Sequence, residues 1–173
     1  MTCMTDPIQS ATFSVLAENR IGVLARVAGL FSGRGYNIDS LTVSPTHDAR
    51  FSRMTIVTHG DSVILEQIEK QLTKLIDVVK VTHLQGDSYV AREIMLIKVH
   101  ADGHERNEIL QVADIFKANV VNITTDSLVI QVTGKQEKLD AFVELMKTFG
   151  IVELARTGQV ALTRNSGTTE EWI

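Results

Sequence analysis

The sequence predicts an α+β protein made of two βαββαβ units that follow one another along the chain. Between residues 11 and 84, stretches with the alternation of strands and stretches with the spacing of helices occur in the order strand, helix, strand, strand, helix, strand. The same order begins again after residue 88. Each unit is therefore expected to pack two helices on one face of a four-stranded antiparallel sheet, which is the ferredoxin-like arrangement.

The first unit contains two helices, each with one apolar face. A turn containing Gly22 leads into the first helix, Gly33 and Gly35 end it, and Gly60 precedes the second helix. The apolar positions are Leu24, Val27, Ala28 and Phe31 in the first helix and Leu65, Ile68, Leu72 and Leu75 in the second. The strands are expected at residues 11–16, 38–44, 51–58 and 78–84.

The second unit repeats this order of elements. Its first helix is expected at residues 107–116, and Asn119 is expected to adopt the left-handed conformation that follows many helices. When Gly60 is aligned with Gly134, Leu65 falls on Leu139, so the second helices of both units share one register. The second helix of this unit has the apolar stripe Leu139, Phe142, Val143 and Met146, and the strands are expected at residues 93–100, 120–124, 128–133, 151–155 and 160–163.

The segments between and outside these units are polar. Gly86, Asp87 and Ser88 indicate a linker, and the C-terminal residues are rich in Ser, Gly, Thr and Glu. We therefore expect a flexible leader at residues 1–9, a first domain at 10–85, a linker at 86–89, a second domain at 90–164 and a disordered tail at 165–173.

The composition favours small molecules or proteins as partners. The 173 residues are 44% hydrophobic and carry a formal net charge of −4, which argues against binding to nucleic acid. Cys3 is the single cysteine, so an internal disulfide and a cysteine-based zinc site are excluded. The sequence has neither an apolar run near the ~20 residues of a membrane span nor a secretory signal, and a cytoplasmic protein is expected.

The turn before the first helix is the best candidate for a binding site. Gly22 stands where a strand ends and a helix begins, so free N–H groups of the first helical turn can face an anionic group. Asn19 offers an amide donor and a carbonyl acceptor beside them, as a zwitterionic amino acid requires. Two structural interpretations stay open, because Asn19 can cap the helix and Gly22 can simply supply a permissive backbone angle. The second unit has no similar turn, and binding is expected in the first unit alone.

No catalytic constellation is found in the sequence. The glycines at 33 and 35 follow a helix instead of opening one, so they indicate helix termination and not a dinucleotide loop. His100 and His104 stand four residues apart beside Asp102 and Glu105, a set that can hold a divalent ion but is common at strand ends and turns. No metal or catalytic site is therefore assigned. The other histidines, His47, His59 and His83, are isolated and are interpreted as turn or surface residues.

At these residues the chain resembles the small, regulatory subunits of acetohydroxyacid synthase, also called acetolactate synthase. The resemblance covers about residues 11–164 and is carried by NRIGVLARVAGLFSGRGYNIDSLTV, SRMTIVTHGD, LEQIEKQLTKLIDVVKV and REIMLIKV. It implies a first domain of the ACT type that binds valine, a ferredoxin-like second domain and a homodimer. It also implies a role in the biosynthesis of valine, leucine and isoleucine. There the chain would activate a separate catalytic large subunit and confer feedback inhibition by valine.

The resemblance further implies that the chain is not catalytic and holds no cofactor. Thiamine diphosphate, Mg²⁺ and FAD belong to the large subunit, which joins two pyruvates, or pyruvate and 2-oxobutyrate. Carried over by position, the valine site combines residues of two protomers, namely Asn19, Gly22, Val23 and Leu24 of one chain with Asn37 and Ile38 of its partner. Ala25 departs from the small hydroxylated residue of many relatives. The alternatives are an amino-acid-sensing ACT protein with another target, or a small ferredoxin-like enzyme.

Overall fold

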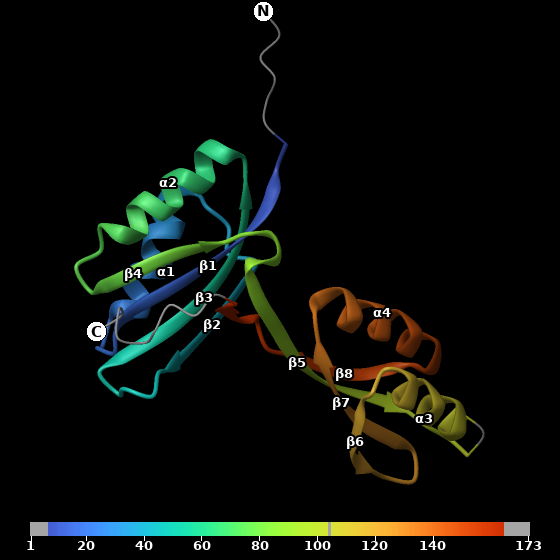
Figure 1. The fold of residues 1–173 in the computed structure, drawn as a ribbon. Helices are drawn as coiled ribbons and strands as arrows, with labels where there is room; N and C mark the ends of the chain where they lie inside the picture. The colour runs from blue at the N-terminus through green and yellow to red at the C-terminus, as the bar shows by residue number, and fades with distance from the viewer. Residues whose placement is uncertain (1–6, 104, 165–173) are drawn as a thin grey trace, which may run out of the picture. The chain divides into compact units, whose positions relative to one another are not determined.

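The computed structural model describes residues 7–103 and 105–164, and Figure 1 shows its fold. These residues divide into two compact units, one formed by residues 7–90 with 159–164 and the other by Ala91–Gly158. The tail expected at residues 165–173 and most of the leader expected at 1–9 lie outside the described residues. Within the described residues, no helix is both long and apolar enough to cross a membrane.

The first unit has the predicted βαββαβ order. Its antiparallel sheet has the strand order β2-β3-β1-β4. The elements are β1 (Gln9–Glu18), α1 (Val23–Arg34), β2 (Ser40–Pro45), β3 (Phe51–Gly60), α2 (Ser62–Thr73) and β4 (Val78–Leu84). Because β2 pairs only with β3, it forms one edge of this sheet.

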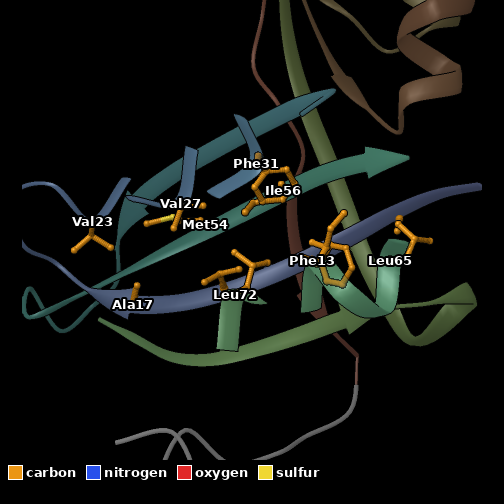
Figure 2. Close-up of a cluster of buried hydrophobic side chains, with 12 residues drawn as sticks. Phe13, Ala17, Val23, Val27, Phe31, Met54, Ile56, Leu65 and Leu72 are labelled. Carbon is orange, nitrogen blue, oxygen red and sulfur yellow. The ribbon is translucent and has the colours of Figure 1, made fainter. Parts of the chain in front are cut away.

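The two helices of the first unit pack on one face of its sheet. Alternation along β1 sends Phe13 and Val15 to this face, where their partners on β3 are Ile56 and Met54. Figure 2 shows the side chains of Phe13, Met54 and Ile56 meeting those of α1 and α2. From the helices come the buried side chains of Val23, Val27, Phe31, Leu65, Ile68 and Leu72. The expectation that Leu24 lies on this face was wrong, because Val23 is buried there and Leu24 is exposed.

Two strands of the first unit begin at other residues than predicted. Strand β1 begins at Gln9, which was expected in the leader, because Gln9 is already paired with Gly60. Strand β2 begins at Ser40 and not at residue 38. Asn37 and Ile38 therefore lie in the connection between α1 and β2, where the Asp39 amide donates to the Val57 carbonyl oxygen at 2.8 Å.

The second unit has the strand order β6-β7-β5-β8, and its helices cover one face of the sheet. Its elements are β5 (Tyr89–His100), α3 (Glu105–Ile115), β6 (Asn119–Ile123), β7 (Ser127–Gly134), α4 (Gln136–Met146), the short helix η2 (Lys147–Phe149) and β8 (Ile151–Arg156). The buried core is aliphatic apart from Phe142 and the methionines, and includes Met95, Ile97, Val99, Ile109, Leu128, Ile130, Leu139 and Met146. Residues 86–88 of the expected linker form the short helix η1 (Gly86–Ser88), and β5 follows at once.

The expected strand at residues 160–163 is present as β9 (Val160–Thr163), and it pairs with β5. It groups with the first unit, so the second unit ends at Gly158 and not at residue 164. The Gln159 amide donates to the Ser40 hydroxyl at 3.3 Å, and the Arg164 amide donates to the Ser88 carbonyl oxygen at 2.8 Å. Such long-range hydrogen bonds have no periodic signal in the sequence.

The left-handed residue after α3 is Lys117, with φ 52°, and the prediction of Asn119 was wrong. The Lys117 amide donates to the Asp114 carbonyl oxygen and the Ala118 amide donates to the Ala113 carbonyl oxygen, which closes the helix two residues earlier. Asn119 is already the first residue of β6.

Candidate functional site

The turn between β1 and α1 depends on Gly22. This residue has φ 88° and ψ −9°, a left-handed conformation that costs other residues about 1–2 kcal/mol. An added Cβ atom would meet nothing within 4 Å, so the backbone angle and not crowding requires glycine here. Of the interpretations that the sequence left open for Gly22, the need for a permissive backbone angle is confirmed.

The first turn of α1 leaves two N–H groups without partners. The Val23 amide lies 3.4 Å from the Arg20 carbonyl oxygen, and the Arg26 amide donates to the Gly22 carbonyl oxygen at 3.0 Å. Between them, the amides of Leu24 and Ala25 have no hydrogen-bond acceptor within the described part of the chain. The first turn contains no acidic residue and no side-chain cap. Two free donors at the positive end of a helix suit a carboxylate.

Asn19 does not cap the helix, which settles one interpretation that the sequence left open. Its Nδ2 atom donates to the Ala49 carbonyl oxygen at 3.0 Å, and its backbone amide donates to the Arg50 carbonyl oxygen at 2.7 Å. Asn19 therefore connects the turn to the hairpin loop between β2 and β3. Its side chain is exposed, and its Oδ1 atom accepts no hydrogen bond from the described residues.

The two apolar candidates of this turn have different environments. The Val23 side chain is 3% exposed and packs in the core of the first unit, so it cannot touch a ligand. Leu24 is 43% exposed and lies on the same turn as the free amides. Leu24 is therefore the side chain available for an apolar group.

The second group of candidates follows the other end of α1. Asn37 is exposed, and its Nδ2 atom donates to Asp39 Oδ1 at 2.5 Å. The hydroxyl of Thr58, which is fully buried, donates to the Asn37 carbonyl oxygen at 2.5 Å. Ile38 is half-buried against the core. The Thr58 hydroxyl and the Asp39 amide, which donates to the Val57 carbonyl oxygen, thus hold this segment on β3.

A single protomer does not bring the two groups together. They lie at opposite ends of α1, whose 12 residues extend over about 18 Å. One amino acid cannot span that length. Asn19 and Gly22 are thus one group of candidate residues, and Asn37 and Ile38 are a separate group.

Sequence reasoning missed Asp39 and misjudged His59. The Nδ1 atom of His59 lies 3.0 Å and 2.9 Å from the two carboxylate oxygens of Asp39, so His59 is not isolated. The ring of His83 is stacked on that of Phe13, with centroids 4.7 Å apart. The pairing of Ser40 with Val57 brings residues 39 and 59 close together, and a correct register for this hairpin would have revealed the contact.

The described residues contain no group of three or more His, Cys, Asp or Glu side chains that could hold a metal ion. His104 lies outside the described residues, so its pairing with His100 is not described. His100 is the exposed last residue of β5.

Comparisons with known proteins agree on one family. Residues 13–80 match the family model described as "AHAS small subunit-like ACT domain", and residues 92–165 match "Small subunit of acetolactate synthase". The chain is 52% identical over 155 residues to the probable acetolactate synthase small subunit of Archaeoglobus fulgidus, covering 90% of this chain and 97% of that protein. It is 51% identical over 152 residues to the acetolactate synthase isozyme 3 small subunit of Escherichia coli, covering 87% and 93%.

A solved structure gives the same result. The crystal structure of the acetolactate synthase small subunit from Thermotoga maritima superposes with a TM-score of 0.85 at 39% identity, covering 91% of this chain and 99% of that chain. With two matching domain models in the expected order and relatives matched over nearly their whole length, this chain belongs to the acetolactate synthase small-subunit family.

Proposed function

We propose that this chain activates a separate catalytic large subunit of acetolactate synthase, and that valine bound between two copies of its first unit inhibits the complex. The observation that carries the proposal is the division of the candidate site into two halves at opposite ends of α1. Membership of a small-subunit family supports the existence of a large-subunit partner.

A two-fold symmetric pair of first units would complete the site. In such a pair, two α1 helices that pack antiparallel set the start of one against the end of the other. Asn19 and Gly22 of one protomer would then meet Asn37 and Ile38 of its partner. The edge strand β2 supports this arrangement, because its outer N–H and C=O groups are unpaired within the described sheet and can pair with a second copy.

The chemistry of the two halves suits valine. The free amides of Leu24 and Ala25, at the positive end of α1, would bind its carboxylate. Asn19 and Asn37 are exposed polar groups for its ammonium. The exposed side chain of Leu24 and the half-buried side chain of Ile38 would enclose its isopropyl group.

In this proposal the chain performs no chemistry of its own. Thiamine diphosphate, Mg²⁺ and FAD remain with the large subunit, and the chain acts by changing the populations of the conformations of its partner. Inhibition by valine then requires that valine bind the inhibited state more tightly than the active one.

The test is acetolactate formation from pyruvate by the large subunit, measured with and without this chain and with and without valine. The chain alone should be inactive, the large subunit should be stimulated by it, and valine should reverse that stimulation. Substantial turnover by the pure chain, or no effect of the chain on the large subunit, would contradict the proposal. Pull-down of the large subunit separates this function from that of a sensor with another target.

A further inference from the structure

The orientations of two side-chain amides in the candidate site are fixed by groups that can only accept hydrogen bonds. The Asn37 amide lies against the Asp39 carboxylate, with Nδ2 2.5 Å from Oδ1. The Asn19 amide lies against the Ala49 carbonyl oxygen at 3.0 Å. An ionised carboxylate and a carbonyl oxygen offer no proton, so each must face the NH₂ end of the amide. In both asparagines the Oδ1 atom is therefore turned toward the opposite side as an acceptor.

Asp39 is itself held in place from two directions. Its backbone amide donates to the Val57 carbonyl oxygen at 2.8 Å, and both of its carboxylate oxygens lie within 3.0 Å of His59 Nδ1. The Asn37 backbone is held separately by the Thr58 hydroxyl. The direction of the Asn37 side-chain amide thus depends on Asp39, while the position of its backbone does not.

We propose that Asp39 is a positioning residue that determines the ligand class of this site, an inference that rests on the proposed function. By holding the Asn37 amide with Oδ1 as the free acceptor, it makes the site select a ligand with an ammonium group. The site therefore takes α-amino acids in preference to the 2-oxo acids of the same shape, whose keto oxygen can only accept. The carboxylate of Asp39 is 35% exposed and adds a negative charge beside Asn37, which also favours a cationic group over a neutral keto group nearby.

The variant Asp39→Asn removes the reason for this orientation at almost constant shape. An amide at position 39 can donate as well as accept, so Asn37 becomes free to turn its NH₂ group toward the ligand. Valine should then bind about tenfold more weakly, because a charge-assisted hydrogen bond is lost. The 2-oxo analogue, 3-methyl-2-oxobutanoate, should bind more tightly, because its keto oxygen gains a donor.

Opposite changes distinguish this role from a purely structural one. A general loosening of the segment would weaken both ligands together. The 2-hydroxy analogue is a third test ligand. Its hydroxyl group can donate or accept a hydrogen bond, so the affinity for this ligand should change least. Asp114→Asn is the matched control, since Asp114 is an exposed carboxylate of the second unit with its own lysine partner.

The experiment is calorimetry of valine, 3-methyl-2-oxobutanoate and 2-hydroxy-3-methylbutanoate with the full chain, its Asp39→Asn variant and the control. We expect weaker valine binding and stronger oxo-acid binding in Asp39→Asn alone. The inference would be overturned by equal changes for both ligands, by no change, or by the absence of oxo-acid binding to either protein. If the unmodified chain still binds valine, these outcomes leave the proposed function intact. Failure of the unmodified chain to bind valine would instead contradict the proposed function.

If Asp39→Asn does not fold, His59→Gln provides a second test. It leaves Asp39 in place but removes the imidazole that holds its carboxylate. The same opposite changes in valine and oxo-acid affinity are expected, at a smaller magnitude. Identical affinities in His59→Gln and the unmodified chain would overturn the role of the Asp39 contact network.

Discussion

The two units share a fold down to its irregularities, yet only the first has a candidate site. The strand orders correspond, and the edge pairing of each long central strand is interrupted at the same place, between Leu16 and Ala17 in one unit and between Lys98 and Val99 in the other. An added Cβ atom at Gly60 would lie 2.7 Å from Ile64, and the corresponding distance at Gly134 is 2.6 Å from Lys138. Burial and close packing therefore account for what is repeated.

The connections account for what differs. In both units the hairpin turn opposite the first helix accepts a backbone hydrogen bond, from Asn19 in the first and from Ala101 in the second. In the second unit, however, the Arg106 guanidinium on α3 also donates to the carbonyl oxygens of residues 101, 124 and 125. The Glu105 amide has Asp102 Oδ1 at 3.4 Å. Among the described residues, the Glu105 amide at the start of α3 thus has a side-chain acceptor, while the amides of Leu24 and Ala25 at the start of α1 have none.

The connection after the helix differs as well. Residues 35–39 join α1 to β2, whereas residues 116–118 suffice between α3 and β6. The segment that carries Asn37 and Asp39 is thus two residues longer than its counterpart in the second unit, where Ala118 stands before the strand in place of Asp39. A core pattern can thus be repeated while the function depends on a few connecting residues.

The largest expected effect comes from Gly22→Asp, which makes the first unit resemble the second by filling its helix start. The new carboxylate would compete with the ligand for the free amides, and valine affinity should fall roughly tenfold to several hundredfold. The left-handed angle costs about 1 kcal/mol and the helix dipole returns part of it, so the fold should persist. Calorimetry and activity titration measure both consequences.

The matched control is Gly103→Asp, in the turn before α3, where an added Cβ atom also meets nothing within 4 Å. It should leave the response to valine unchanged. If both variants lost valine binding equally, the contrast between the two helix starts would be wrong.

A smaller effect is expected from Asn19→Ala, since the second unit already has alanine at the corresponding position. Ala101 makes the equivalent backbone hydrogen bond without a polar side chain, so the fold does not require one. Valine affinity should fall about tenfold through the lost acceptor for its ammonium. The measurement is calorimetry beside urea unfolding. Destabilisation with unchanged valine affinity would assign Asn19 to the turn alone.

The converse variant, Asp102→Ala, should affect stability and not binding. It removes the side-chain cap of α3 and should lower the free energy of unfolding by about 1 kcal/mol. Urea unfolding followed by circular dichroism measures this change. A clear change in inhibition by valine would show that the second unit takes part in the response.

Predictions from the sequence were correct where the burial of a residue follows from the periodicity of its helix or strand. The fold class, the apolar stripe of α4 and that of α1 after Leu24 were predicted correctly, because burial leaves a period of 3.6 or 2 in the sequence. The prediction for Leu24 was wrong, since Val23 is buried in its place. The left-handed angle of Gly22 was one of the interpretations that the sequence left open, since a glycine between a strand and a helix can serve either the backbone or a ligand. The partners of Asn19, Asp39 and His59 were not predicted, because these contacts depend on how two hairpin strands register. Long-range hydrogen bonds at loop ends leave no periodic trace.

The smallest effect concerns the hairpin loop that holds Asn19. The Arg50 side chain, bound to the Asp48 carboxylate, lowers the pKa of Asp48 from 3.8 to about 2, and the Arg50 backbone amide adds to this. This depressed pKa favours the folded state above pH 3.8, and that contribution is lost as the pH falls toward 2.

In Arg50→Ala the pKa of Asp48 should rise toward its ordinary value but remain below it, because the amide at position 50 still donates to Asp48. NMR titration of the Asp48 carboxyl carbon in both proteins, from pH 6 to below pH 2, would measure the change. The carbonyl oxygens of residues 49 and 50 remain in place, so valine affinity at neutral pH should fall less than in Asn19→Ala. An equal loss would mean that the Arg50 side chain, and not the loop backbone, positions Asn19.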